Sequence, residues 1–147
     1  MNALQKRLAQ IGTEPHENGL CDGIVFEDSY NRHYWIFNHY SFYEWLKHYM
    51  MHYAGLSWEE ATEKLAQNSL FATPPKDLEN LFCITHELTY HNAMEIAKGN
   101  IYWQDGTPSD TNDFQEEHDV WYKQTKEKYH LNEEYEILSF EEILKLN

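Results

Sequence analysis

Basic side chains are scarce in this chain. Its 147 residues include 11 Lys and Arg against 25 Asp and Glu, which gives a formal net charge of −14 at pH 7. Proteins bind nucleic acid largely through Lys and Arg that neutralise phosphates, and the largest basic cluster here is the pair Lys6 and Arg7. Bases also stack on aromatic side chains, but such surfaces work beside basic grooves. We therefore expect no direct binding of nucleic acid.

Cysteine and long apolar runs are scarce as well. The two cysteines, Cys21 and Cys83, form no CxxC pattern, which predicts reduced thiols of the kind found in cytosolic proteins. Residues 1–15 contain basic side chains but lack the apolar stretch of a secretory signal. No run approaches the roughly 18 apolar residues of a membrane span. We therefore expect a cytoplasmic protein that does not contact a membrane.

The short motifs of common enzymes are missing. The six glycines are scattered, and neither GxGxxG nor GxxxxGK(S/T) occurs, so no phosphate-binding loop is predicted. Neither cysteine lies in a papain-like or caspase-like context, and GxSxG is absent. The many carboxylates do not by themselves define a glycosidase pair, which needs two carboxyls about 5–10 Å apart in a cleft. We therefore expect no catalytic residues, no cofactor and no enzyme activity.

Apolar and aromatic content predicts a folded chain. Hydrophobic residues make up 41% and aromatic residues 16% of the sequence, whereas disordered chains combine high charge with few aromatic residues. A chain of this length can bury about 70% of the surface that its unfolded form exposes. We therefore expect one domain that spans residues 1–147.

Apolar periodicity and capping residues predict a mainly helical fold. Residues 24–26 and 33–37 are rich in β-formers on either side of a turn, which predicts a hairpin. Residues 101–103 and 135–138 are expected as further short strands. Helix N-terminal signals occur at Ser41, at Ser57 with Glu60, and at Ser139 with Glu142. Helices are expected over residues 3–11, 41–55, 57–67, 85–98 and 113–129, and after Ser139, with one or two helical turns over residues 77–82.

Together these patterns predict an α+β fold that is mainly helical. We expect about five to six helices and a small antiparallel β hairpin or sheet.

Two histidine pairs are candidate metal ligands. His48 and His52 are four residues apart, a spacing that directs two imidazoles to the same side of a helix. His86 and His91 nearly match the zinc-hydrolase motif HExxH, but the extra residue places them about 140° apart around an ideal helix. Neither pair has an assignable third ligand. We therefore predict no metal site, and a small metal-dependent hydrolase that uses one of these pairs is kept as an alternative.

Acidic side chains accumulate toward the C-terminus. Residues 105–147 hold 12 Asp and Glu against 4 Lys. On the helix expected over 113–129, apolar residues share one face and acidic residues the other. Helix capping explains only a few of these charges, and self-repulsion among the rest weakens the folded state. A negative surface instead attracts a basic partner and speeds association.

Aromatic residues are common in the most important contacts of protein interfaces, and this chain has 11 Tyr and 5 Trp. Tyr43 and Met51 fall off the apolar face of the helix expected over 41–55, so both are candidate exposed anchors. The predicted partner-binding residues are Asp110, Asp113, Glu116, Glu117, Asp119, Glu127, Glu133, Glu134, Tyr43 and Met51.

In its size, acidity, aromatic content and lack of catalytic motifs, the chain resembles the bacterial immunity proteins that neutralise polymorphic toxins, including those of contact-dependent growth inhibition systems. The resemblance covers the whole chain in character and rests on no diagnostic motif. It implies a cognate toxin domain, often a basic nuclease, whose active site the immunity protein blocks. We expect the free protein to be a monomer. An acidic mimic of nucleic acid that inhibits nucleic-acid enzymes is the other alternative.

Overall fold

The computed structural model describes residues 1–145, and these residues form two compact units. The first unit contains Met1–Phe42, Pro74–Leu81 and the part of Asn132–Asn147 up to residue 145. The second unit contains Tyr43–Thr73 and Phe82–Leu131. The prediction of one domain over residues 1–147 stays a prediction.

The fold is α+β and mainly helical, as predicted, but residues 1–145 form eight α-helices instead of about five to six. The prediction of the helix number was wrong because short helices carry little periodicity. The clearest case is α4 (Ser69–Ala72), a single turn marked only by Asn68, whose side chain accepts the N–H of Phe71. None of the helices in residues 1–145 is long and apolar enough to cross a bilayer.

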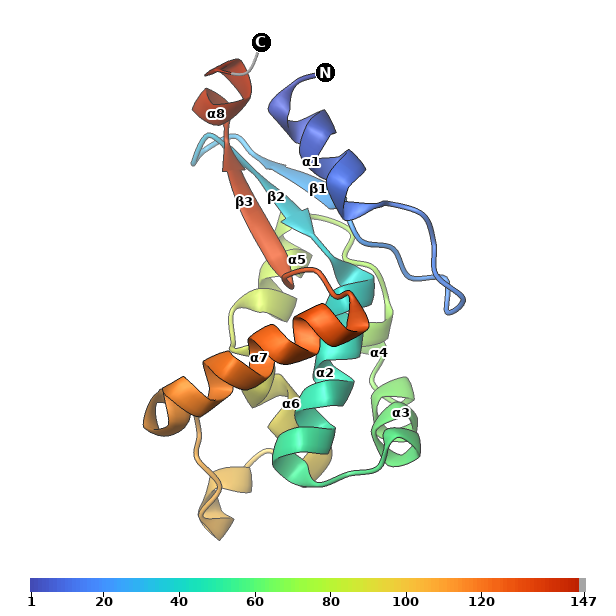
Figure 1. The fold of residues 1–147 in the computed structure, drawn as a ribbon, viewed down its shortest axis with the longest axis vertical. Helices are drawn as coiled ribbons and strands as arrows, with labels where there is room; N and C mark the ends of the chain where they lie inside the picture. Colours follow the sequence, from blue (N-terminus) through green and yellow to red (C-terminus); the bar gives the residue numbers. More distant parts are fainter. Residues whose placement is uncertain (146–147) are drawn as a thin grey trace. The chain divides into compact units, whose positions relative to one another are not determined.

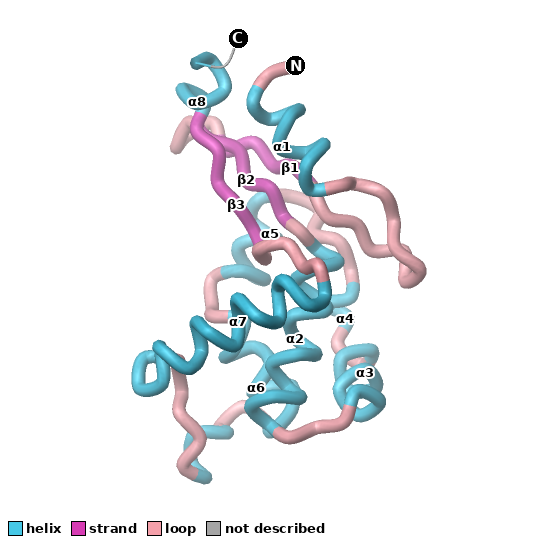
Figure 2. Tube along the Cα trace, in the orientation of Figure 1, coloured by secondary structure: helices cyan, strands magenta, loops and turns pink. Residues whose placement is uncertain are grey.

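The first unit contains a three-stranded antiparallel sheet in the order β1-β2-β3 (Figures 1 and 2). The predicted hairpin is confirmed as β1 (Ile24–Asp28) and β2 (His33–Phe37), and the predicted last strand is confirmed as β3 (Tyr135–Ser139). β3 pairs with β2, so β2 is the central strand. The sheet therefore joins segments that are far apart in the sequence.

The strand expected over residues 101–103 does not form. Residues Tyr102–Asp105 are instead a 3-10 helix, η1. The Tyr102 side chain is buried, and its hydroxyl donates to the carbonyl of Ser109 at 3.0 Å. Gly106 follows in a left-handed conformation with φ 96°. This compact turn holds the segment in a shape that cannot join a sheet.

The helix α1 (Ala3–Ile11) begins and ends as predicted, and Asn2 and Gln5 form its capping box. Leu8 lies against Gly23, just before β1, while Arg7 forms a 2.6 Å ion pair with Glu136 of β3. Gly23 has φ +77°, and a Cβ there would lie 2.6 Å from the Thr13 side chain. Only glycine therefore allows this close approach of the chain.

The N-terminus of α2 (His39–Ala54) is capped by a residue that is distant in sequence. The helix begins before Ser41, so the prediction that Ser41 is its N-cap was wrong. The carboxylate of Asp22 instead accepts both the backbone N–H of Ser41, at 2.8 Å, and its hydroxyl, at 2.6 Å. The carbonyl of Cys21 accepts the N–H of Tyr40. A negative charge at this position also favours the helix macrodipole.

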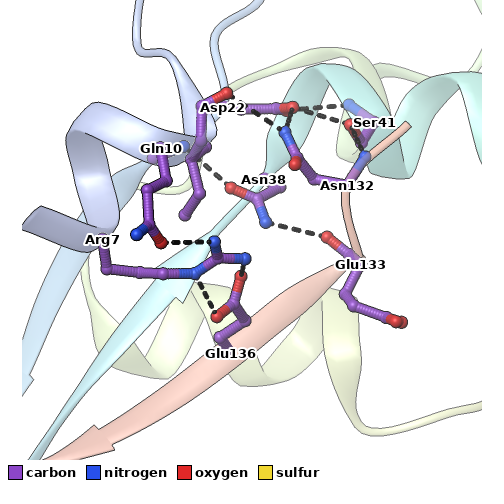
Figure 3. A network of polar contacts seen from close by, with 10 residues as sticks. Arg7, Gln10, Asp22, Asn38, Ser41, Asn132, Glu133 and Glu136 are labelled. Atoms are coloured by element: carbon purple, nitrogen blue, oxygen red, sulfur yellow. Dashed lines mark hydrogen bonds and ion pairs between the residues drawn. The ribbon is translucent and has the colours of Figure 1, made fainter. Parts of the chain in front are cut away.

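Two asparagines extend this polar network to the segment before β3 (Figure 3). Asn132 donates from its side chain to Asp22 at 2.8 Å and from its backbone to the Ser41 hydroxyl at 2.9 Å. Asn38 is fully buried; its side chain accepts the N–H of Gly23 and donates to the carbonyl of Glu133 at 2.8 Å. The start of β3 is thus fixed by hydrogen bonds to the loops around β1 and β2.

α8 follows β3 directly and spans Phe140–Lys145. The Ser139 hydroxyl accepts the N–H of Glu142, as the predicted N-terminal signal requires.

The second unit is helical. It contains the rest of α2, α3 (Trp58–Ala66), α4, the last residues of α5 (Leu78–Thr85), α6 (Thr89–Lys98), η1, η2 (Asn112–Phe114) and α7 (Gln115–Tyr129). The predicted capping box of Ser57 and Glu60 is confirmed.

Two helices of the second unit start later than predicted. The helix expected from residue 85 begins at Thr89, because α5 occupies the chain up to Thr85. The helix expected from Asp113 begins at Gln115, because residues 112–114 form the tighter turn η2.

Aromatic rings fill much of the second unit's core. The Trp45 side chain is fully buried and stacks on Tyr122, with centroids 4.1 Å apart and planes within 2°. Trp121 meets Trp45 edge to face at 5.9 Å. Such ring pairs contribute about 0.5–1.5 kcal/mol beyond the area they bury. Other buried residues of this core are Leu46, Tyr49, Met50, Ala61, Leu65, Phe71, Ile84, Tyr90, Ala93 and Met94.

Replacing the buried Asn38 with alanine should destabilise the protein by about 2 kcal/mol, because the Gly23 N–H and the Glu133 carbonyl would lose their partner. Urea unfolding followed by circular dichroism measures this loss. The exposed turn residue Asn100 provides the control, because Asn100→Ala removes a side-chain amide that faces solvent. Equal stability of the two variants would contradict a structural role for Asn38.

Candidate functional site

Negative charge concentrates in the segment that leads into α7. Residues 105–119 contain six Asp and Glu and no Lys or Arg. The later part of α7 is different, because Lys123, Lys126 and Lys128 surround Glu127 there. This order of charges matches the helix macrodipole, which favours acids in the first turn and bases in the last. Four of the five acids predicted to form one face of this helix, all except Glu127, therefore lie at or just before its beginning.

Glu117 is held in place by two side chains of α2. Its carboxylate accepts from the Tyr53 hydroxyl at 2.8 Å and lies 3.0 Å from Nε2 of His52. Burial raises the pKa of Glu117, but the hydrogen bonds from His52 and Tyr53 outweigh it and place the pKa below its ordinary value. Glu117 is therefore an ionised carboxylate with a fixed position.

Asp119 ends a chain of polar contacts that starts inside the unit. The Tyr49 hydroxyl lies 2.7 Å from Nε2 of His118, and Nδ1 of His118 lies 3.1 Å from the Asp119 carboxylate. Gln115 donates to the same carboxylate at 2.7 Å. The hydrogen bonds from His118 and Gln115 lower the pKa of Asp119, so it stays ionised.

The order of groups in Tyr49, His118 and Asp119 is that of a nucleophile, a base and an orienting carboxylate. Tyr49, however, is only 3% exposed. These contacts therefore hold α7 against α2 in the packed interior.

The other acids predicted for this segment lie beside Glu117 and Asp119 in the sequence. Asp113 and Glu116 are exposed. Asp110 is half-buried, and its carboxylate accepts the N–H of Asn112. Glu127 is exposed but lies among the lysines of α7. Glu117 and Asp119 are exposed as well. Asp113 and Glu116 differ from them in having no side-chain partner described above, so their carboxylates are the simplest ones to test as partner contacts.

Glu133 and Glu134 belong to the first unit, where both side chains are half-buried. Their carbonyl groups accept hydrogen bonds from the side chain and backbone of Asn38. They are therefore not part of the α7 segment.

Tyr43 and Met51 are half-buried, not exposed as predicted. The ammonium group of Lys47 lies 5.4 Å from the centre of the Tyr43 ring. Helical periodicity placed both residues off the apolar face of α2. They are nevertheless half-buried, because neighbouring elements pack against more than one face of this helix.

Met51 lines an open groove of about 400 Å³ between α2 and α7. The His52 ring stacks on Trp121 in its wall, with centroids 4.8 Å apart, and the same histidine contacts Glu117. The groove therefore borders the acidic start of α7. Its lining residues are His48, Met51, His52, Trp121, Gln124, Thr125, Lys128 and Tyr129.

The histidine pairs make other contacts. Within residues 1–145 no group of three or more His, Cys, Asp or Glu is placed to hold a metal ion. His48 packs against the rings of Tyr129, at 4.3 Å, and Trp58, at 5.5 Å. Burial lowers its pKa to about 4, with smaller contributions from the charges of Lys47 and Lys128. His48 is therefore a neutral residue of the packed interior at pH 7.

His86 lies in the turn after α5, and not in a helix with His91 as expected. Its Nδ1 is 3.0 Å from the carbonyl of Phe82, so it caps the C-terminus of α5. His91 lies on α6, 2.8 Å from both the Tyr102 hydroxyl and the Glu95 carboxylate. The two imidazoles thus stabilise separate turns of the chain.

No protein-family model, curated protein or solved structure matches this chain.

Sequence reasoning did not identify His52, Tyr53 and His118 as the residues that position the acidic carboxylates. The four-residue spacing of Tyr49 with Tyr53, which matches that of His48 with His52, shows that one side of α2 carries repeated polar rings. The residues of α7 that meet these rings, Glu117 and His118, are adjacent in the sequence. The repeated rings of α2 were therefore the signal that could have found the contacts.

Stability should fall as the pH drops from 6.5 toward 4. In this window His48 in the unfolded chain binds a proton, with an ordinary pKa of 6.5, whereas the folded state binds it only near pH 4. Protonation therefore favours the unfolded chain. Urea unfolding at pH 7 and at about pH 5 measures the loss, which should be smaller in His48→Gln.

His130→Asn is the matched control for this experiment. His130 is exposed and adopts the left-handed conformation that asparagine tolerates, so this variant should keep the pH dependence of the unchanged protein. The same loss of stability in His48→Gln and His130→Asn would contradict the assignment to His48.

Proposed function

We propose that this protein is a non-enzymatic immunity protein that binds a cognate basic toxin domain, a nuclease, and neutralises it by covering its active site. One observation carries the proposal: residues 105–119 contain six carboxylates and no Lys or Arg, and Lys98, from outside this segment, pairs with one of them, Asp105. Asp113 and Glu116 are exposed in this segment, and Glu117 and Asp119 are held in their ionised form.

Fixed carboxylates suit fast and tight binding. A side chain that is already held in position loses less conformational freedom when a partner binds. The contacts of Glu117 with His52 and Tyr53, and those of Asp119 with His118 and Gln115, provide this advantage. The negative potential that they produce also steers a basic partner toward the segment.

A nuclease is the class of toxin that fits such a surface. Its active site binds the phosphates of a polyanion through Lys and Arg. A row of carboxylates competes for the same side chains and excludes the substrate by charge and by volume. The groove beside Glu117 supplies ring surfaces such as Trp121 for apolar contacts, which charge alone does not provide.

The direct test co-expresses this protein with any secreted-toxin domain that a neighbouring gene encodes. Co-expression should abolish its toxicity, and the purified proteins should form a nanomolar or tighter complex. Association should be fastest at low salt. The absence of any complex with such a toxin domain would contradict the proposal.

The double variant Asp113→Lys and Glu116→Lys tests the placement of the interface. Stopped-flow association with the toxin domain at low salt should slow about tenfold or more, because the steering charges are reversed. Glu59→Lys with Glu63→Lys is the matched control: both residues are exposed on α3, and Glu59, like Glu116, lies in the first turn of its helix. Equal slowing in the two double variants would show that only net charge matters and that α7 is not the interface.

A further inference from the structure

β3 is an edge strand of the sheet (Figure 1). Among residues 1–145 no further strand pairs with its outer side. An edge strand exposes a row of N–H and C=O groups with which another extended chain can pair. The orientation of these groups in β3 decides which residues are available.

The hydrogen bonds between β2 and β3 define this orientation. The Asn38 N–H donates to the carbonyl of Glu134, and the Phe140 N–H donates to the carbonyl of Arg32. In an antiparallel ladder, residues whose backbone groups face the partner strand alternate with residues whose groups face away. The register continues this alternation through Glu136, which is opposite Ile36.

The backbone groups of Tyr135 and Ile137 therefore face away from β2. Their side chains are also unusually open for apolar residues, because 41% of Tyr135 and 48% of Ile137 are exposed. The Tyr135 ring lies 5.1 Å from that of Trp35 in the neighbouring strand. The outer edge of β3 thus offers unpaired backbone groups together with an apolar surface.

The opposite edge of the sheet is protected. The odd-numbered residues of β2 face β1, and Trp35 is opposite Phe26, so Val25 and Glu27 carry the outward groups of β1. Glu27 is charged and exposed, and charged side chains are a common means of blocking an edge strand. β3 has no charged side chain at the equivalent outward positions Tyr135 and Ile137.

The charge around β3 selects its occupant. Residues 133–142 contain five Glu and no Lys or Arg. Arg7 pairs with Glu136 and Arg32 with Glu141, which leaves an excess of negative charge. A second copy of the chain would bring two acidic strands together, and like charges on paired strands are unfavourable. A basic segment would gain both the main-chain hydrogen bonds and the attraction of its charges to the glutamates.

We propose that β3 accepts an extended, basic segment of a partner protein as a fourth strand of the sheet. Main-chain hydrogen bonds to Tyr135 and Ile137 give affinity in this mode of recognition, and alternate side chains give specificity. The segment has apolar residues that lie beside Tyr135 and Ile137, with Lys or Arg at its ends opposite the glutamates. The inference rests on the proposed function only for the identity of the partner, the basic toxin.

The first experiment uses a defined peptide, Lys-Lys-Val-Thr-Val-Thr-Val-Lys-Lys, and amide hydrogen exchange measured by NMR on the intact protein. In the free protein the amides of Tyr135 and Ile137 should exchange fast, and those of Glu136 and Leu138 slowly. Millimolar peptide should slow exchange at Tyr135 and Ile137 about tenfold or more. The same peptide with Glu in place of Lys should have little effect.

Three results would overturn the inference: no change at these two amides, protection at Val25 and Glu27 instead, or protection in the absence of peptide caused by a dimer of this chain. Because this experiment uses the unaltered protein, it does not depend on the folding of a variant.

The second experiment compares Ile137→Pro with Ile137→Thr in binding to the toxin domain. Proline removes only an outward N–H, and it is tolerated at such positions of edge strands; threonine keeps that N–H. Ile137→Pro should weaken binding about tenfold relative to Ile137→Thr. A tight toxin complex that is insensitive to Ile137→Pro would overturn the β3 site and leave the proposed function intact. If the peptide pairs with β3 but no toxin complex forms, the β3 site stands and the proposed function is overturned.

Discussion

The carboxylate of Asp22 is the interaction on which the first unit depends. It caps the N-terminus of α2 through Ser41 and binds the side chain of Asn132, which comes just before β3. An isolated buried carboxylate would be costly, but here each oxygen accepts a hydrogen bond. The cap and the attachment of β3 therefore stabilise one another. If Asp22 were lost, the helix would lose its cap and β3 one of its anchors.

The parts of the fold that local sequence determines were predicted well. The bounds of α1, the hairpin and the capping box at Ser57 follow from residues within a few positions of one another. The beginning of α2 could not be predicted in this way, because its cap is supplied by Asp22 from a separate loop. The strand expected over residues 101–103 was wrong for a related reason. Residues that favour strands form one only beside a neighbouring strand, and here the hydrogen bond from Tyr102 to Ser109 holds the segment in a turn.

The candidate site was predictable in charge but not in geometry. The acidic composition of residues 105–119 is visible in the sequence, whereas the contacts of Glu117 with His52 and Tyr53 require the packing of α7 on α2. Histidines that suggested metal ligation by their spacing serve as hydrogen-bond donors to carboxylates or as packed rings. Spacing reports which side chains share a face of a helix, and only the facing helix decides what they bind.

The chain order of the first unit has a consequence for synthesis. β3 follows the whole second unit in the sequence, so the central strand β2 waits for its second neighbour until residues 43–131 have been made. The helical second unit has all its segments made before β3, and its contacts join residues that are closer in the sequence. The sheet closes last, and its closure joins residues distant in the chain, which is a slow step. An incomplete translation product thus carries the acidic segment before α7 but not the edge strand, and the two surfaces mature at different times.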